Sequence, residues 1–429
     1  MKLTTEKAVY GGDCLARAGG AEAKAGKAVF VPLTLPFETV TAHVTEEKRS
    51  FAKAEVDQML VASPNRVPPR CPYFGACGGC HYQHADYAEQ LGMKMQILRE
   101  TLARAGVAVP AETGVLAGNP WSYRNRIRVA FTPGGEFGYR GRRSHAIVPI
   151  DECAIAAPML LQVAKEIRKF AAENPGNVAL SELELFANDD ETQILLTLFC
   201  KQPPADGARA WLAALEAVLP PQITGLRLHL ADRSHSRHIL ASTGETQLTY
   251  FAAGFGYRVE HGAFFQVNRW LIDEFVGRVI ETHNGKSAWD LFAGVGLFAR
   301  ALTANFAQVL AVEFAPASFE ALRHNLEGTT GRAVGSTTLD FLRRNREKRE
   351  AGPDLIVLDP PRAGLGEETT RLLNAVGAAE MVYVSCDPTT LARDLRALTE
   401  ERYKVEKITL VDMFPQTFHL ETVVHLRRC

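Results

Sequence analysis

From about residue 256 to the C-terminus, the chain alternates strictly between apolar strands and helices, and this pattern limits its possible folds more than any other feature. Residues 287–292 read as a strand, 297–304 as a helix and 309–313 as a second strand. Strands that alternate with helices in this way are typical of a parallel sheet packed between helices. The sequence therefore predicts a Rossmann-like α/β domain over residues 256–429.

A glycine turn connects the first strand of this domain to its helix. Gly294-Val-Gly296 comes shortly after Asp290, and Glu313 ends the next strand, 19 residues after Gly294. Glycines let the backbone approach a ligand, and an acid at the end of the second strand accepts hydrogen bonds from a ribose diol. Because the third glycine of a dinucleotide fingerprint is missing, the pattern favours S-adenosylmethionine over NAD as the cofactor.

One cysteine follows a buried strand at the position where such sheets bind ligands. Cys386 stands directly after the apolar run 381–385, at the carboxyl end of a predicted strand. We interpret it as a candidate nucleophile, and a small buried hydrophobe is the alternative interpretation. Asp359, held by two prolines at the tip of the strand 354–359, should lie at a neighbouring tip, and Glu421 precedes the last strand as a candidate base.

Three closely spaced cysteines follow a proline-rich linker at residues 63–70. Cys71, Cys77 and Cys80 are separated by five and then two residues, and the glycines among them let the backbone wrap around a metal centre. A 4Fe-4S cluster takes four thiolates, for which Cys153 is the fourth candidate, and zinc is the rival metal. Structural disulfides are not expected, because the cytosol keeps thiols reduced.

The first 62 residues read as short strands separated by turns. Their alternation of apolar and polar positions predicts a small antiparallel OB-like β-barrel, which is either an oligonucleotide platform or a plain structural domain. Residues 63–255 then form a central α+β region that carries the cysteines. This region includes a helix over 86–106, a candidate to pack on the catalytic domain, whose polar side carries Gln90 and Lys94.

Arginine and aromatic residues are concentrated in the segment 121–145. Guanidinium groups bind phosphates and aromatic rings stack on unpaired bases, so the segment is a candidate RNA-binding surface, with a solvated sheet face as the alternative. Strand alternation places the first three of its arginines on one face. The candidate RNA contacts are Arg124, Arg126, Arg128, Tyr139, Arg140, Arg142 and Arg143.

The charge balance of the chain excludes a globally basic protein. Its formal net charge is -1 over 429 residues, so an RNA partner must be held by a local patch. Neither a signal segment nor an uninterrupted apolar run of about 18 residues is found. A cytoplasmic, monomeric enzyme without membrane attachment is therefore expected.

Five motifs, in this order, resemble those of the RNA 5-methyluridine (uracil-C5) methyltransferases. They are residues 264–268, 290–296, 359–362, 385–394 and 412–421. The resemblance extends to the barrel, which looks like a TRAM domain, and to the four cysteines of the family branch that bears an iron-sulfur cluster. It implies a class I S-adenosylmethionine-dependent methyltransferase that modifies RNA. The domain layout favours 23S ribosomal RNA, and transfer RNA is the alternative.

The resemblance also implies roles for individual residues. Cys386 would add to carbon 6 of an unpaired, flipped uridine, and Glu421 would remove the proton from carbon 5. The cofactor contacts would be Gln266, Phe292, Gly294, Leu297, Glu313, Thr337 and Asp359. The ligands of a 4Fe-4S cluster would be Cys71, Cys77, Cys80 and Cys153.

Two residues depart from the family pattern. Leu297 stands where a polar residue is common, so it offers no side-chain hydrogen bond to the cofactor. Asp387 replaces a more usual Asn beside the nucleophile, and its charge is expected to raise the thiol pKa unless Arg362 or Arg393 pairs with it.

Three other classes share part of this pattern. A radical enzyme would need three cysteines spaced by three and two residues, which this chain lacks. An amino-group methyltransferase would carry an Asn in place of Asp359 and would need no nucleophilic cysteine. A non-catalytic RNA-binding or iron-sulfur redox-sensing protein would bind its partner without transferring a methyl group, so an assay of methyl transfer to bulk RNA separates it from the enzyme.

Overall fold

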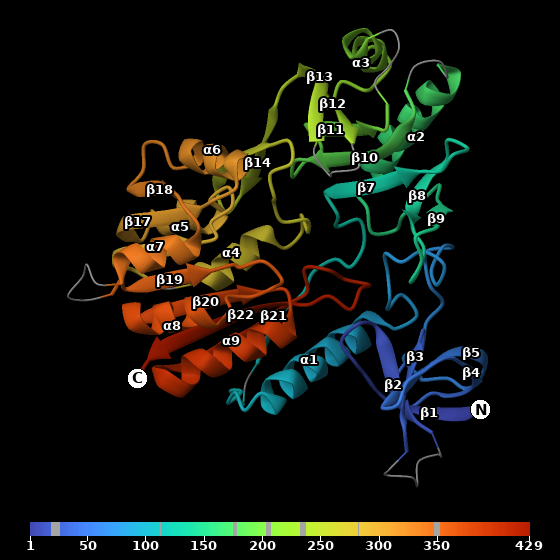
Figure 1. Ribbon diagram of the computed structural model, residues 1–429, viewed down its shortest axis with the longest axis horizontal. Coiled ribbons are helices and arrows are strands. Elements are labelled where there is room, and N and C mark those ends of the chain that lie inside the picture. The colour runs from blue at the N-terminus through green and yellow to red at the C-terminus, as the bar shows by residue number, and fades with distance from the viewer. Residues whose placement is uncertain are drawn as a thin grey trace.

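The computed structural model describes residues 1–18, 26–111, 113–174, 178–202, 207–231, 237–281, 283–346 and 352–429. Figure 1 shows an N-terminal barrel, a central sheet and a large C-terminal sheet with helices on both faces, each at its own corner of the molecule. The predicted multidomain α/β architecture is confirmed. In the described part of the chain, no helix has both the length and the apolar character needed to cross a membrane.

Five strands close into the N-terminal barrel in the order β1-β2-β3-β5-β4. They are β1 (Lys2–Ala8), β2 (Asp13–Arg17), β3 (Ala28–Pro32), β4 (Thr39–Glu47) and β5 (Phe51–Val61). Because side chains alternate across a strand, residues such as Leu3, Val29 and Val40 point inward and form the core of the barrel. The predicted barrel is confirmed, although one of its strand pairs, β3 with β5, is parallel.

The central sheet has seven strands in the order β13-β12-β11-β10-β7-β8-β9. Their bounds are β7 (Arg126–Phe131), β8 (Phe137–Arg140), β9 (Ile147–Pro149), β10 (Leu180–Ala187), β11 (Ile194–Cys200), β12 (Ile223–Ala231) and β13 (Arg237–Gly244). Helices α2 (Pro158–Glu173) and α3 (Ala208–Glu216) pack on one face. On the other face, Phe186 and Leu195 pack with the hairpin of β14 (Gln247–Ala252) and β15 (Phe255–Glu260).

The C-terminal sheet has eight strands in the order β18-β17-β16-β19-β20-β22-β21-β6. Its later strands are β16 (Gly285–Leu291), β17 (Phe306–Glu313), β18 (Gly331–Gly335), β19 (Leu355–Leu358), β20 (Glu380–Ser385), β21 (Tyr403–Val411) and β22 (Glu421–Arg428). The strands from β18 to β20 are parallel, and β22 is antiparallel to both of its neighbours.

Helices cover both faces of this sheet, so its strands are buried on both sides and read as continuous apolar runs. In β19, Leu355 and Val357 face one core while Ile356 and Leu358 face the other. The first core is covered by α4 (Ile272–Ile280), α5 (Leu297–Leu302) and α6 (Pro316–Asn325). The second is covered by α7 (Thr338–Asn345), α8 (Glu367–Val376) and α9 (Pro388–Glu401).

Two elements from before residue 256 complete the C-terminal sheet. Strand β6 (Gly114–Leu116) pairs in parallel with β21 and forms the last strand. Helix α1 (Tyr87–Arg104) contributes Met93 and Leu98 to the core that also contains Leu395 of α9. In Figure 1, α1 lies between the barrel and α9, so it connects the N-terminal barrel to the helices of the C-terminal sheet.

Candidate active site

Two neighbouring strands place Cys386 beside Glu421 at one edge of the C-terminal sheet. β20 ends at Ser385 and pairs with antiparallel β22, in which Thr422 lies opposite Ser385. One residue further out is Cys386 on the first strand and Glu421 on the second. The charge of Glu421 acts on the thiol, so the structure brings the predicted nucleophile and the predicted base together.

The surroundings of Cys386 favour its protonated thiol. Burial, followed by the negative charge of Glu421, raises the pKa of Cys386 to about 11, and Asp359 adds to the rise. The Arg362 guanidinium opposes it. Because only the thiolate is a good nucleophile, this site needs a positive charge close to the sulfur before it can react at neutral pH.

The buried Glu421 and the partly buried Asp359 form a pair of carboxyl groups next to this thiol. Glu421 is 4% exposed, and its Oε1 has no hydrogen-bond partner among the described residues. Burial, and then the charge of Asp359, raise the pKa of Glu421 well above its ordinary value. Burial also raises the pKa of Asp359 to about 7. A buried carboxyl oxygen without a partner is costly, and such groups gather at functional sites.

The glycine turn after β16 brings three of the predicted cofactor residues together. The N–H of Gly294 donates to Oε2 of Glu313 at 2.8 Å, and the two N–H groups after Glu313 donate to Oε1. Phe292 and Gly296 have φ angles of 66° and 92°. A Cβ on Gly296 would lie 2.7 Å from a leucine side chain, so this position requires glycine.

The other predicted cofactor residues have different surroundings. Gln266 is buried, and its backbone carbonyl accepts a hydrogen bond from the Asn125 side chain at 3.1 Å. Leu297 packs in the core, as expected of an apolar residue, and its carbonyl accepts a hydrogen bond from the Tyr257 hydroxyl at 3.0 Å. Thr337 caps α7: its hydroxyl oxygen accepts the N–H of Asp340 at 3.1 Å.

Asp387 is not among the groups with the largest effect on the pKa of Cys386. Its carboxylate caps the N-terminus of α9, where it accepts the N–H groups of Thr389 and Thr390 at 2.9 and 3.0 Å. Arg393 pairs with Asp394 instead, at 2.8 Å. The carboxylates that raise the pKa of the thiol most are those of Glu421 and Asp359, so Asp387 contributes less than either of them.

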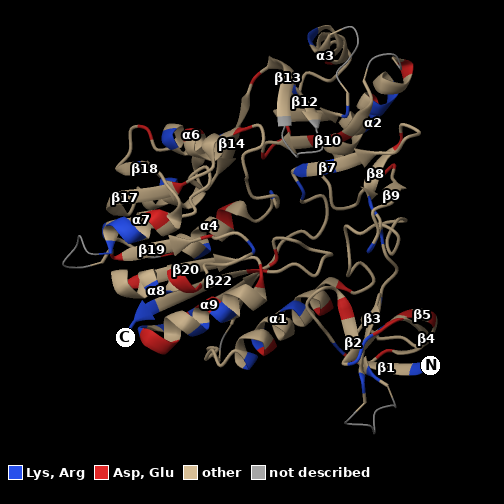
Figure 2. Cartoon of the chain, in the orientation of Figure 1, with Lys and Arg blue, Asp and Glu red and all other residues tan. Residues whose placement is uncertain are grey.

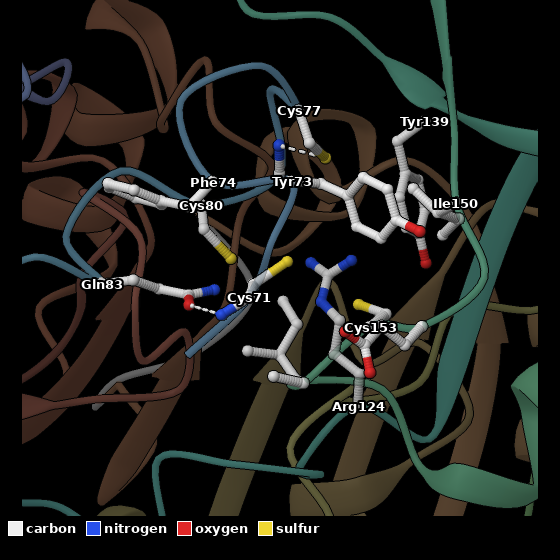
Figure 3. Close-up of a pocket in the computed structure, with 14 residues that line it drawn as sticks. Cys71, Tyr73, Phe74, Cys77, Cys80, Gln83, Arg124, Tyr139, Ile150 and Cys153 are labelled. Atoms are coloured by element: carbon white, nitrogen blue, oxygen red, sulfur yellow. Dashed lines mark hydrogen bonds between the residues drawn. The ribbon is translucent and has the colours of Figure 1, made fainter. Parts of the chain in front are cut away.

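Away from Cys386, a cavity of about 70 Å³ is lined by all four cysteines predicted to bind a metal. Figure 3 shows the side chains of Cys71, Cys77, Cys80 and Cys153 around this cavity, together with Tyr139 and others. Burial raises the pKa of the Cys80 thiol to about 12, and each of the other three cysteines would raise it further by its charge. Four thiols that repel one another when ionised are the donor set of a cationic metal centre.

A single zinc ion and a cluster of several metal atoms require different distances between four thiolates. Two thiolates on one zinc ion lie at most about 4.6 Å apart, twice the Zn–S bond length of about 2.3 Å. Among the described residues, no three His, Cys, Asp or Glu side chains are placed to hold one metal ion. A centre with several metal atoms would hold its thiolates further apart than one ion does.

The arginines predicted to form an RNA-binding surface do not share an exposed face. Arg124 lines the cysteine cavity, as does Tyr139. The guanidinium of Arg126 lies 3.9 Å from the centre of the Phe186 ring and donates to the Ala263 carbonyl at 2.8 Å. Arg126 therefore contacts Phe186 and Ala263, which belong to the core that the hairpin of β14 and β15 forms, while Arg124 lies at the cysteine cavity.

The remaining arginines of this set are more exposed but largely paired with carboxylates. Arg128 pairs with Glu182, Arg142 with Glu55 and Arg143 with Asp13. The side chain of Arg140 is 60% exposed, with its nearest carboxylate 4.0 Å away. Figure 2 shows acidic and basic residues mixed along α1, α7, α8 and α9 as well, so these helices do not present a face of a single charge.

Sequence analysis missed two contacts that reach the site from the N-terminal third of the chain. Gln90 and Lys94 of α1 were assigned to its polar side, yet both are buried against residues 412–416. The hydroxyl of Tyr10 in the barrel donates to the carbonyl of Cys386 at 3.5 Å. A contact between residues more than 300 positions apart leaves no local signal in the sequence. Two polar residues one helical turn apart, such as Gln90 and Lys94, are only a weak sign that they share a partner.

Comparison with known proteins places the chain in one family. The family model described as tRNA (Uracil-5-)-methyltransferase matches residues 86–339 and 346–429. An uncharacterised RNA methyltransferase of Aquifex aeolicus is 32% identical over 99% of this chain and 98% of its own length. The 23S rRNA (uracil(1939)-C(5))-methyltransferase RlmD of Salmonella paratyphi A is 33% identical over 94% of this chain and 92% of its own length.

Among solved structures, the chain is similar in fold to the tRNA (uracil-54, C5)-methyltransferase of Pyrococcus abyssi, which was crystallised with S-adenosyl-L-homocysteine. The TM-score is 0.78 at 24% sequence identity, and the alignment covers 99% of this chain and 100% of the other. The similarity therefore includes the barrel and the central sheet as well as the C-terminal sheet.

Proposed function

The chain belongs to the tRNA (uracil-5-)-methyltransferase family and is an RNA methyltransferase, and we propose that it methylates carbon 5 of one uridine through a covalent bond to Cys386. The observation that carries this proposal is the pairing of Cys386 with Glu421 across β20 and β22. This arrangement places a thiol at the end of one strand beside a buried carboxyl group whose Oε1 has no hydrogen-bond partner in the described structure.

In the proposed reaction, carbon 5 of uracil is too weak a nucleophile to accept a methyl group unaided. The Cys386 thiolate adds to carbon 6, and the displaced electron pair makes carbon 5 the nucleophile of an enolate. After carbon 5 has gained the methyl group, the Glu421 carboxylate removes the proton that carbon 5 still carries. The electron pair of that C–H bond re-forms the double bond and expels the thiolate from carbon 6.

The cofactor site that we propose lies at the glycine turn. Bound S-adenosylmethionine supplies the methyl group and a positive sulfonium charge, which favours the thiolate. Three N–H groups hold the carboxylate of Glu313 at the end of β17, where it can accept hydrogen bonds from the ribose hydroxyls. We assign Gln266, Phe292, Gly294, Leu297, Thr337 and Asp359 to the same site, Leu297 through packing alone.

For the cysteine cavity, we propose a 4Fe-4S cluster held by Cys71, Cys77, Cys80 and Cys153. Four thiols around one cavity match the ligand set of such a cluster, and a single zinc ion held by the same four thiolates is the rival centre. Iron and acid-labile sulfide should be found in protein purified without oxygen, and a Cys153→Ala variant should lose both. Retention of zinc in their place would overturn this assignment.

We propose 23S ribosomal RNA as the substrate, with the target uridine flipped out of an unpaired loop. The relatives that are named as 23S rRNA methyltransferases align with more than nine-tenths of the chain. A transfer RNA is the second candidate, because the protein of similar fold from Pyrococcus abyssi carries that name. Mass spectrometry of nuclease digests from a deletion strain distinguishes the two by the RNA that loses its methyl group.

The proposed layout assigns residues 1–62 to an OB-like TRAM barrel, 63–255 to the central region and 256–429 to a Rossmann-like catalytic domain. We propose that the barrel and the exposed Arg140 contact the RNA backbone. We further propose a cytoplasmic monomer, which needs no partner copy because Cys386 and Glu421 come from the same chain.

Two variants test the covalent mechanism. Cys386→Ala should bind S-adenosylmethionine normally but transfer no methyl group, because no adduct at carbon 6 can form. Glu421→Gln should form the adduct and fail to release it, so a covalent protein–RNA species should accumulate on denaturing gels. Methyl transfer by Cys386→Ala would refute the covalent mechanism.

A further inference from the structure

The segment from Asp412 to Gln416, between β21 and β22, is held by groups from four other parts of the chain. We call residues 412–420 the base loop, because Glu421 follows it directly. Each of the five carbonyl groups from 412 to 416 accepts a hydrogen bond from outside the loop. The donors are Asn268 for the first two, Lys94 for the third, Tyr123 for the fourth and the N–H groups of His81 and Tyr82 for the fifth.

Gln416 is the residue of the base loop with the most unusual backbone. Its φ angle is 68°, a left-handed conformation that is unfavourable for a residue with a side chain. Gln90 of α1 binds it twice: the Gln90 Nε2 donates to the Gln416 Oε1 at 3.0 Å, and the Gln416 N–H donates to the Gln90 Oε1 at 3.0 Å. A conformation of this kind persists only where the surroundings fix it.

A buried ion pair fixes the start of the same loop. Nζ of Lys94 lies 2.5 Å from Oδ1 of Asp412, and both side chains are fully buried. The Tyr87 hydroxyl donates to the other oxygen of Asp412 at 2.9 Å. Because a buried ion pair contributes little net stability, its use is better explained by the single geometry that it imposes.

Residues 71–82, which carry Cys71, Cys77 and Cys80 and which we call the cysteine loop, contribute the last of these contacts. The N–H groups of His81 and Tyr82, which come directly after Cys80, donate to the Gln416 carbonyl at 2.8 and 3.0 Å. The ring of His81 also lies 4.6 Å from that of Phe418, edge to face. The base loop therefore contacts α1 on one side and the cysteine loop on the other.

We propose that Gln90 and Lys94 are positioning residues that, with the cysteine loop, hold the base loop so that Glu421 faces carbon 5 of the bound uridine. This inference rests on the proposed function. It assigns a role in catalysis to a helix that the sequence places outside the catalytic domain, and to residues that do not touch the reacting atoms.

The proposal predicts which chemical step depends on Gln90. The first two steps are addition of the thiolate to carbon 6 and methylation of carbon 5. They use Cys386 and the cofactor, and Gln90 positions neither of these. Removal of the proton from carbon 5 uses Glu421, which follows the loop directly. When Glu421 is misplaced, the C–S bond to carbon 6 stays intact because the proton on carbon 5 stays in place, and the methylated RNA remains attached to the protein.

The experiment compares three full-length variants in steady-state assays, which give kcat and KM, and in single-turnover assays with labelled S-adenosylmethionine and substrate RNA, which follow the covalent species. Gln90→Leu removes both hydrogen bonds to Gln416. Gln90→Glu has nearly the same shape and keeps the acceptor for the Gln416 N–H, but it puts a carboxyl oxygen in place of the Nε2 that donates to the Gln416 Oε1 and to the Ala85 carbonyl. Because it preserves the volume of the side chain, it serves as a second variant in case Gln90→Leu fails to fold. Gln96→Leu is the matched control, because Gln96 lies on the exposed side of α1 and bonds only to Glu100 in the described structure.

For both Gln90 variants we expect kcat to fall by about 10- to 100-fold, the cost of misplacing a group by about 1 Å, with KM for S-adenosylmethionine changed less than about 2-fold. Labelled methyl groups should accumulate on a covalent protein–RNA species, as in Glu421→Gln. The Gln96→Leu variant should match the unmodified protein in both measurements.

Two results would overturn the inference while leaving the proposed function intact. One is a Gln90→Glu variant that releases product as fast as the unmodified protein. The other is a fall in kcat without an increase in the covalent species, accompanied by lower thermal stability, which indicates a purely structural contact. Failure of the proposed function is seen separately, because RNA containing 5-fluorouridine would then form no covalent species with the unmodified protein.

Discussion

The thiol of Cys386 lies in a site that disfavours its own reactive form. Burial and the neighbouring carboxylates raise its pKa to about 11, while Arg362 lowers it. Such a site protects the cysteine when no cationic ligand is bound, because a protonated thiol is slow to be alkylated or oxidised. Reactivity would then appear only when a positive charge enters.

The charges around Cys386 predict opposite effects for two substitutions. Glu421→Gln removes a negative charge that raises the thiol pKa, so the pKa should fall. Arg362→Gln removes a positive charge that lowers it, so the pKa should rise. The rate of alkylation of the peptide containing Cys386, followed by mass spectrometry from pH 7 upward, should increase for the first variant and decrease for the second. Equal rates in both variants would contradict this assignment of charges.

At the scale of single residues, the sequence predicted positions better than environments. Cys386 and Asp359 were predicted from their places at the carboxyl ends of parallel strands, which come together at one edge of a sheet, and Glu421 was predicted from its place before the last strand. The N-cap role of Asp387 was not predicted, although the signal was present: an Asp followed by a Pro at the first helical position is typical of a helix N-cap. Its carboxylate binds the start of α9, and Glu421 and Asp359 have larger effects on the thiol.

Helix α9 depends on that cap, and the charge of Asp387 is not what matters. Asp387→Ala should lower the free energy of unfolding by about 1 kcal/mol, because two N–H groups at the start of α9 lose their acceptor. Asp387→Asn should be almost neutral, since Asn caps helices about as well as Asp. Urea unfolding measures both changes.

A substitution at the other end of α9 serves as the control for this test. Glu400 pairs with Arg396 on the exposed side, and Glu400→Ala should lower the free energy of unfolding by less than Asp387→Ala does, because an exposed ion pair contributes little. A loss of stability in Asp387→Asn as large as that in Asp387→Ala would mean that the negative charge itself is required.

Helix α1 illustrates what a single element hides from sequence analysis. Its apolar positions predicted one buried face correctly, and Met93 and Leu98 lie there. The opposite side was taken to be solvated because it carries polar residues. In the structure, part of that side binds the base loop through Gln90 and Lys94. Periodicity reports which residues are apolar, and it does not report whether a polar partner covers the others.

At the scale of the whole molecule, the barrel contacts the rest of the chain through both apolar side chains and ion pairs, and its Cys14 belongs to the core that also contains residues of α1. Arg143 pairs with Asp13, and Lys7 pairs with Glu100 of α1. The ring of Tyr10 meets that of Phe418 edge to face, with 5.3 Å between the ring centres. Tyr10 is therefore the barrel residue that reaches both the base loop and the carbonyl of Cys386.

The two parts of the Tyr10 side chain should have separable effects. Tyr10→Ala removes a ring pair worth about 1 kcal/mol and should weaken RNA binding by about 5-fold, because the barrel is held less firmly beside the site. Tyr10→Phe keeps the ring and should bind RNA nearly as well as the unmodified protein. Filter binding at a fixed salt concentration measures both. Equal losses in the two variants would assign the effect to the hydroxyl instead.

The order of the large parts along the chain was predictable, but their interleaving was not. Composition and alternation indicate where a barrel ends and where strands begin to alternate with helices. They do not indicate that β6, three residues long, adds itself to a sheet formed mostly by residues after 285. Such pairing depends on an open strand edge nearly 300 residues away, which only the folded chain provides.

The position of β6 has a consequence for how this architecture can be recombined. A fragment that begins at residue 256 would leave β21 as a bare edge and would expose the apolar surface that α1 covers. Bare edges and apolar surfaces of this kind promote aggregation. Grafts between relatives should therefore keep residues 87–116 together with the C-terminal sheet, and a chimera that exchanges one without the other is expected to be insoluble.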